Sequence, residues 1–121
     1  MSKAIFRAAG AVLAVAAVVY VSMFMPLPFV QAWWSVSDYR DPFHRKQRIA
    51  DGLVLSRTLI GLSREEIELK LGVPPETSYF SNWDLVYPLG QERGFISIDS
   101  EWLVIRFDGQ GTTSEARVVR D

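Results

Sequence analysis

Cysteine is absent from this chain of 121 residues, and histidine occurs once, at position 44. The lack of cysteine excludes a disulfide framework, a thiolate nucleophile, a thiolate metal site and the acylated cysteine of a bacterial lipoprotein. The formal net charge is only −1, so the composition gives no sign of the basic face that DNA or RNA binding requires. We therefore expect no nucleic acid among the partners.

Patterns that indicate catalysis or metal binding are also scarce. His44 lies in a polar segment, and no nucleophile-elbow pattern accompanies it. Asp99 and Glu101 would share one face of a strand, but no third or fourth cation ligand is evident near them. Residues 108–115 lack the ligand spacing of a calcium loop, and residues 90–94 lack a phosphate-loop pattern. We predict no enzyme activity, cofactor, metal site or small-molecule substrate.

One long apolar run stands against these absences. Ala8–Val30 contains no charged residue, and as a helix it would span about 34 Å, enough for a hydrocarbon core of about 30 Å. Lys3 and Arg7 precede the run, as expected for a cationic flank. Trp33 and Trp34 follow it, and we predict that both lie at the membrane interface.

Residues 1–34 are therefore expected to be a membrane anchor that is not cleaved, because the run exceeds the usual 7–15 apolar residues of a signal peptide. The alternative is cleavage before Trp33, since Val30 and Ala32 place small residues at positions −3 and −1. Basic residues occur on both sides of the run, so the positive-inside rule pulls in both directions. A translocated C-terminal domain is the orientation we expect.

A polar linker is expected over residues 35–44, followed by one domain over residues 45–121. Ile49 and Leu53 have helical spacing and predict a short amphipathic helix over 45–55. Its first turn is basic. The candidate contacts for anionic lipid headgroups are Arg45, Lys46 and Arg48, and the alternative is an ordinary solvated helix face.

A capping box begins the next helix. Ser63 can accept from the Glu66 amide while the Glu66 side chain reaches back to the Ser63 amide. Gly72 suits the position that ends the helix, so we predict a helix over 64–71.

Beyond this helix the apolar period changes to two, which predicts strands. The expected strands cover 83–87, 102–107 and 115–119, with a further one around 77–80 and a short strand or turn at 96–99. The fold class is therefore α+β: a transmembrane helix, then two short helices packed on an antiparallel meander of three to four strands.

The helix-free face of this sheet is the candidate interaction surface. Trp102 and Arg106 should point to that face, while the alternate residues of their strand face the helices. A large aromatic side chain there is either covered by the chain's own 88–98 loop or displayed as an interface anchor. We take Trp83, Trp102 and Arg106 as candidate protein-interaction residues.

Four short motifs occur in a fixed order within residues 52–119. They are Leu59-x-Gly61-Leu62-Ser63-x-x-Glu66, Leu71-Gly72-x-Pro74, Trp83 to Tyr87, and Leu103-x-Ile105-x-Phe107-Asp108-x-x-Gly111. Their order and spacing resemble the BamE (SmpA/OmlA) domain. The resemblance implies an accessory role in outer-membrane or envelope protein assembly, through binding of partner proteins. Without the acylated cysteine of the family's best-known members, this chain is expected as a single-pass protein of the bacterial inner membrane with a periplasmic domain.

The resulting hypothesis is a membrane-anchored protein-interaction domain of the bacterial cell envelope, with the membrane and other envelope proteins as partners. One alternative is an accessory subunit of an inner-membrane complex, held by the small-residue side that Gly10, Ala11 and Ala14 give the apolar helix. The other is a cleaved, soluble periplasmic binding or inhibitor domain.

Overall fold

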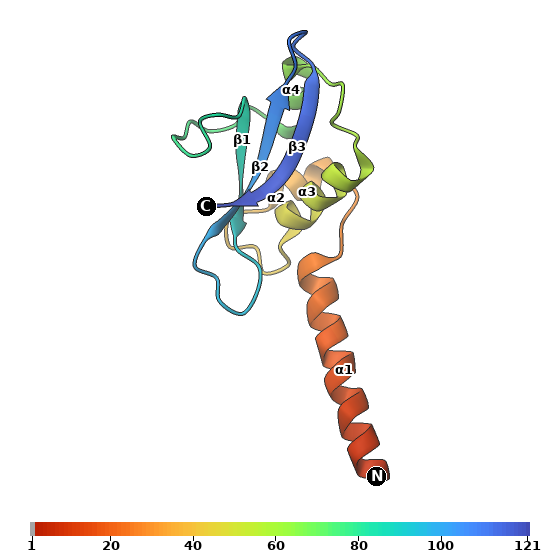
Figure 1. Cartoon of the computed structure of the whole chain (residues 1–121). Coiled ribbons are helices and arrows are strands. Elements are labelled where there is room, and N and C mark those ends of the chain that lie inside the picture. The colour runs from red at the N-terminus through yellow and green to blue at the C-terminus, as the bar shows by residue number, and fades with distance from the viewer. Residues whose placement is uncertain (1) are drawn as a thin grey trace.

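The computed structural model describes residues 2–121 as an α+β chain, with helices first and an antiparallel sheet after them (Figure 1). The helices are α1 (Lys3–Phe24), α2 (Gln31–Val36), α3 (Arg45–Ser56) and α4 (Arg64–Leu71). The strands are β1 (Leu85–Gln91), β2 (Ser100–Phe107) and β3 (Thr113–Arg120), in the order β1-β2-β3.

Helix α1 stands apart from the rest of the molecule and buries none of its side chains (Figure 1). Its 22 residues extend about 33 Å at 1.5 Å per residue, and it is long and apolar enough to cross a membrane. The Ser2 side chain accepts from the Ile5 amide at its beginning. The helix ends at Phe24, just before Pro26, whose ring is incompatible with a continuing helix.

The segment after α1 belongs to the folded domain, although the sequence predicts part of it as a linker. The Leu27 amide donates to the Arg48 carbonyl at 3.0 Å, and the Leu27 and Phe29 side chains pack against the core. Helix α2 follows directly and was not predicted. Ser37, within the expected linker, is buried.

Two of the predicted helices form where expected. Helix α3 places Ile49 and Leu53 in the core. Helix α4 has the predicted capping box: the Ser63 Oγ accepts from the Glu66 amide and the Glu66 carboxylate accepts from the Ser63 amide, both at 3.2 Å. Gly72 ends α4 at φ 86°, a conformation that suits glycine.

The sheet has three strands, and the strand pattern differs from expectation in three places. Pro88 lies inside β1, which continues to Gln91, because β1 is an edge strand and its register shifts between Pro88 and Gly90. Residues 77–80 form a turn with Phe80 at φ 53° instead of the expected strand. Of the two alternatives for residues 96–99, the strand is excluded, because these residues lie in a loop.

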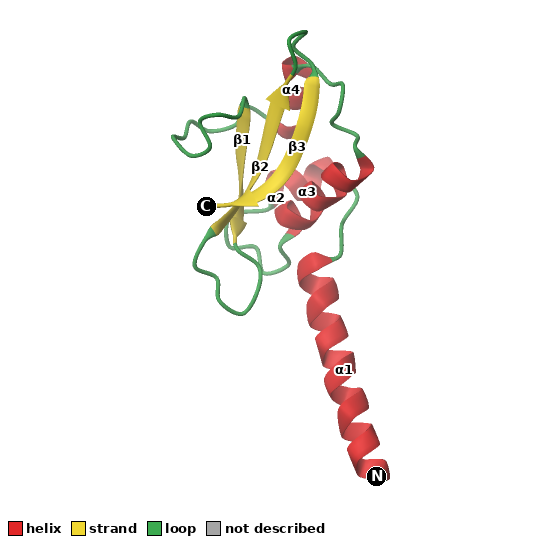
Figure 2. Ribbon diagram, viewed as in Figure 1, coloured by secondary structure: helices red, strands yellow, loops and turns green. Residues whose placement is uncertain are grey.

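The two faces of the sheet are covered differently (Figure 2). Leu103 and Ile105 of β2 face the helices and are fully buried with residues of α3 and α4. Trp102 and Val104 face the other side, where a smaller cluster includes Phe80. The predicted alternation along β2 is therefore confirmed.

Candidate functional site

Trp102, on the helix-free face, is covered by the chain itself. Its side chain is only 9% exposed, and its ring lies 5.3 Å from the Tyr79 ring and 5.9 Å from the Phe80 ring, centroid to centroid. Its indole N–H donates to the Asp121 carboxylate at 3.2 Å. The cover comes from residues 77–83 rather than from the 88–98 loop, so Trp102 is not displayed as an anchor.

Trp83 and Arg106 form the accessible part of the same face. The Arg106 guanidinium lies 4.0 Å from the centre of the Trp83 ring and pairs with Glu115 at 3.1 Å. Stacking of a guanidinium on an indole combines a cation–π attraction with a planar surface, and both groups are partly exposed here. The structure brings together the three residues proposed for protein interaction and leaves two of them accessible.

Trp34 must be corrected as a membrane-interface residue. It is 3% exposed, and its indole N–H donates to the Leu71 carbonyl at 2.9 Å inside the core. Helix α2, which the sequence patterns did not predict, turns Trp34 inward while leaving Trp33 exposed. Trp33 alone of the pair remains available to a membrane interface.

The three basic residues at the start of α3 do not form a free cationic patch. Arg45 pairs with Asp41 at 3.8 Å. The Lys46 Nζ lies 5.1 Å from the centre of the Trp34 ring, and burial lowers the pKa of Lys46. Arg48 is occupied by backbone carbonyl groups. Each of the three residues predicted to contact lipid headgroups therefore already has a partner within the chain: a carboxylate for Arg45, an aromatic ring for Lys46 and backbone carbonyls for Arg48.

Arg48 and Arg93 together satisfy the C-terminal end of α1. Arg48 donates to the Met25 carbonyl at 2.8 Å and to the Ser22 carbonyl at 3.4 Å. Arg93 donates to the Met23 carbonyl at 3.1 Å. The last carbonyls of a helix lack intrahelical donors and carry partial negative charge, which two guanidinium groups complement.

Arg93 is also the centre of a buried ion cluster. Its guanidinium makes a two-point contact with Glu101, at 2.9 and 2.8 Å, and pairs with Asp51 at 2.7 Å. Glu101 is 1% exposed. Burial disfavours the charge of Arg93, but the hydrogen bonds to the Glu101 and Asp51 carboxylates outweigh burial and raise the pKa of Arg93. Sequence patterns missed this cluster, because Asp51 lies 42 residues before Arg93 and no motif joins these two residues to Glu101.

His44 lies beside this cluster, at the beginning of α3. Its backbone is left-handed, with φ 51°. Burial, together with the positive charges of Arg93 and Arg48, lowers the pKa of His44, although Glu101 and Asp41 act in the opposite direction.

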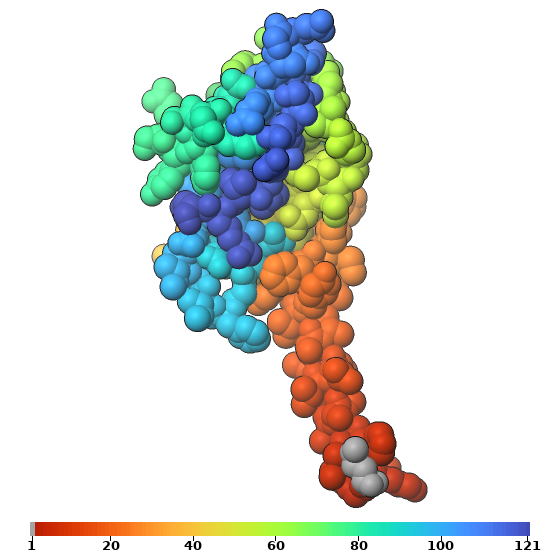
Figure 3. Space-filling view, viewed as in Figure 1, coloured from red at the N-terminus to blue at the C-terminus, as the bar shows by residue number. Residues whose placement is uncertain are grey.

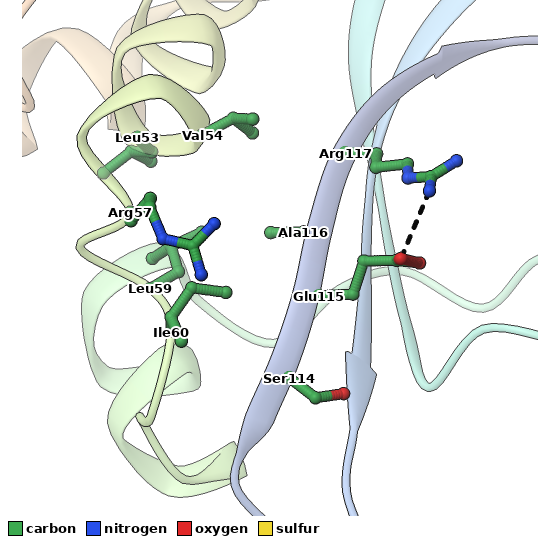
Figure 4. A pocket seen from close by; sticks show the side chains of 9 residues that line it. All are labelled: Leu53, Val54, Arg57, Leu59, Ile60, Ser114, Glu115, Ala116 and Arg117. Atoms are coloured by element: carbon green, nitrogen blue, oxygen red, sulfur yellow. Dashed lines mark hydrogen bonds and ion pairs between the residues drawn. The ribbon is translucent and has the colours of Figure 1, made fainter.

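A groove runs between α3 and the outer edge of β3. Figure 4 shows its upper hollow, a cavity of about 280 Å³ between the end of α3 and β3, with the Arg57 side chain reaching into it. A second hollow of about 520 Å³ shares Val54 and Arg117 with the first and extends to Tyr20 and Phe24 of α1. The groove therefore leads from the domain to the C-terminal half of α1.

Strand β3 borders this groove with an open edge. Its neighbour in the sheet is β2, and the other side of β3 makes backbone hydrogen bonds only at Thr113, with Gly61 and Leu62, within residues 2–121. From Ser114 to Arg120 the outer edge has no such bond to the described chain. Unpaired amides and carbonyls of an edge strand can pair with a strand from another chain.

Comparison of the chain with protein-family models, with curated proteins and with solved structures found no match.

Proposed function

We propose that this protein is a membrane-anchored protein-interaction domain of the bacterial cell envelope. The observation that carries the proposal is the open edge of β3 beside a groove that reaches α1. Helix α1 supplies the anchor. The edge of β3 offers backbone groups that can pair with a partner strand, and the groove offers hollows that can accept the partner's side chains.

The expected mode of binding is strand addition. An extended segment of a partner would pair with β3 between Ser114 and Arg120, and alternate side chains would enter the hollows beside it. Glu115 and Arg117 pair with one another at 3.3 Å along this strand. Charged residues on an edge strand discourage indiscriminate pairing, so the partner would need complementary charges.

Retention of α1 is part of the proposal. Cleavage before Trp33 would remove Leu27 and Phe29, which pack against the core, and would remove the carbonyls that Arg48 and Arg93 bind. A cleaved product would therefore lose part of its own folded domain. This argues for an uncleaved anchor over a soluble periplasmic domain.

The envelope setting rests on the resemblance to the BamE domain. The residues of that resemblance have mainly structural roles here: Ser63 and Glu66 cap α4, and Gly72 ends it. We propose an inner-membrane location with a periplasmic domain and an accessory role in envelope or outer-membrane protein assembly. The resemblance and the absence of a lipidation site support this setting.

The proposal is tested by site-specific photocrosslinking of the full-length chain in bacterial cells. A photoreactive residue placed at Val54 or Ala116, both lining the first hollow, is expected to give one discrete crosslinked product. The matched control places it at Gln110, in the β2–β3 turn at the far end of the sheet (Figure 1). Equal products from all three positions, or none from the groove, would contradict the proposal.

A second candidate is an accessory subunit whose transmembrane helix makes the specific contacts. The observation that favours it is the open space around Gly10 on α1, which would admit a close-packed helix. Replacing residues 8–19 with an unrelated apolar helix separates the two candidates, because it leaves intact the carbonyls that Arg48 and Arg93 bind. Loss of the groove crosslinks in that variant would favour the second candidate.

A further inference from the structure

The loop between β1 and β2 displays an apolar tip. Phe95 is 102% exposed, which means that it contacts almost nothing in the chain, and Ile96 and Ile98 are also exposed. Three large apolar side chains within four consecutive residues form the tip of one loop, residues 92–99. Isolated exposed apolar residues are ordinary, but a contiguous group of this kind usually marks a contact surface.

This loop is fixed at its base. The Glu92 amide donates to the Asp99 carbonyl at 2.9 Å, and the Ser97 hydroxyl donates to the Glu92 carbonyl at 2.7 Å. The Asp99 amide donates to the Glu92 carboxylate at 3.3 Å. The tip is therefore held outward by hydrogen bonds across the loop.

The same loop is joined to the end of α1. Arg93, two residues before Phe95, donates to the Met23 carbonyl at 3.1 Å, and its guanidinium lies 5.1 Å from the centre of the Phe24 ring. Figure 1 shows that the loop extends from the end of the sheet on the side where α1 leaves the domain, and that it reaches beyond the C-terminal end of α1 in the direction of the helix N-terminus. Figure 3 shows the surface of this region beside the end of α1.

We propose that Phe95, Ile96 and Ile98 insert into the lipid bilayer that α1 crosses, as a second membrane contact. The proposal rests on the anchoring role of α1 in the proposed function. With α1 across the bilayer, the C-terminal end of α1 lies at one membrane surface, and the β1–β2 loop reaches the level of that end (Figure 1). The charge of Arg93 does not oppose insertion, because its guanidinium is paired with Glu101 and Asp51 inside the domain and does not lie at the tip.

A two-point attachment fixes the tilt of the domain on the membrane. With α1 as the only contact, the whole chain can still tilt and rotate about the helix axis in the membrane, whereas α1 and the loop together define one orientation. The β3 groove then faces along the membrane at a set height, where a partner anchored in the same membrane could reach it.

The absence of cysteine makes a direct test practical. The variant Ile96→Cys of the full-length chain carries an environment-sensitive fluorophore and is reconstituted in phosphatidylcholine vesicles, with or without a quencher attached to the lipid acyl chains. Two reference positions use the same label. Val15→Cys reports insertion of α1, and Gln110→Cys reports a site at the opposite end of the sheet (Figure 1).

The expected result is strong quenching at Val15, quenching at Ile96 of at least half that extent, and none at Gln110. A water-exposed fluorophore at Ile96 beside a quenched one at Val15 overturns the inference and leaves anchoring intact. Absence of quenching at Val15 overturns both. If the label at Ile96 is not quenched but shows energy transfer between differently labelled copies, the tip contacts a second copy of the chain instead of lipid. That result also overturns the inference.

A second variant excludes insertion driven by the fluorophore. Phe95→Asp with Ile98→Asp, labelled at Ile96, removes the apolar neighbours without touching the hydrogen bonds at the base of the loop. Quenching is expected to fall to the level of Gln110. Unchanged quenching in this double variant contradicts the proposal.

Discussion

Arg93 donates a hydrogen bond to the backbone carbonyl of Met23 across 3.1 Å, and this bond joins the β1–β2 loop to the last turn of α1. The same guanidinium is held by Glu101 on β2 and by Asp51 on α3. A single buried side chain therefore connects the apolar helix, the sheet and a covering helix. Helix α1 and the domain are therefore linked by this cluster rather than by a flexible tether.

Loss of Arg93 is expected to destabilise the domain strongly. Arg93→Met leaves the Glu101 carboxylate buried without its cationic partner, at a cost of about 3–5 kcal/mol in the free energy of unfolding. Urea unfolding of the full-length chain in detergent micelles measures this change. The control is Arg117→Met, which removes an exposed pair with Glu115 and should cost less than about 1 kcal/mol. Equal effects of the two substitutions would contradict the role given to the cluster.

Gly52 tests the close contact between α3 and the segment after α1. A Cβ at this position would clash with the Leu27 carbonyl oxygen, so Gly52→Ala must displace the 26–30 segment or α3. We expect a loss of about 1–3 kcal/mol, the usual range for overpacking. Gly109→Ala is the matched control, because open space surrounds that glycine. Limited proteolysis of Gly52→Ala is expected to show faster cutting near Leu27, and a rate like that of the parent chain would refute the contact.

Trp34 and Trp33 should differ sharply despite their adjacency. Trp34→Phe removes the buried donor to the Leu71 carbonyl, and leaving that carbonyl unsatisfied costs about 1–3 kcal/mol. Trp33→Phe changes an exposed side chain and should alter stability by less than about 0.5 kcal/mol. Thermal unfolding followed by circular dichroism compares the two. A larger loss of stability in Trp33→Phe than in Trp34→Phe would contradict the burial assigned to Trp34.

The lowered pKa of His44 predicts a specific pH dependence of the domain's stability. Because burial and the neighbouring arginines hold the pKa of His44 below its usual 6.5, the unfolded chain binds the proton more readily than the folded chain. This difference in pKa contributes to the free energy of unfolding above pH 6.5. The contribution is lost as the pH falls from 6.5 through the pKa of His44 in the folded chain. His44→Asn removes the titration and suits the left-handed backbone.

Urea unfolding between pH 7.5 and pH 5.5 provides the comparison between the parent chain and His44→Asn. The parent chain is expected to lose more stability over this interval than the variant. Identical slopes would show that His44 does not contribute in the direction assigned to it.

Local patterns were sufficient for much of the fold. The capping box of Ser63 and Glu66 and the stop at Gly72 define α4 within the chain itself, and the period of two along residues 102–107 sets the faces of β2. These features depend on residues that are neighbours in the sequence, so the sequence alone predicts them. The apolar run predicted a helix long enough to cross a membrane for the same reason, although α1 begins earlier, at Lys3, and ends at Phe24 rather than at Val30.

Features that depend on distant contacts were not predictable. Helix α2 has no side-chain cap, and its stability comes from Trp34 packing against Tyr87 and bonding to Leu71. Arg93 is an ordinary loop residue by sequence, and only the register of β1 and β2 brings it to Glu101. The groove beside β3 arises because α3 packs at a distance from the edge of β3, and no sequence motif predicts that distance.

We propose that α1 remains attached and anchors an outward-facing domain in the membrane. A periplasm-active phosphatase, or in parallel a cytoplasm-active fluorescent protein, fused after Asp121 tests it in cells, with membrane fractionation and product size measured together. We expect an active phosphatase on a full-length, membrane-bound product and no fluorescence. A soluble product shortened to begin at Trp33, or fluorescence without phosphatase activity, would contradict it.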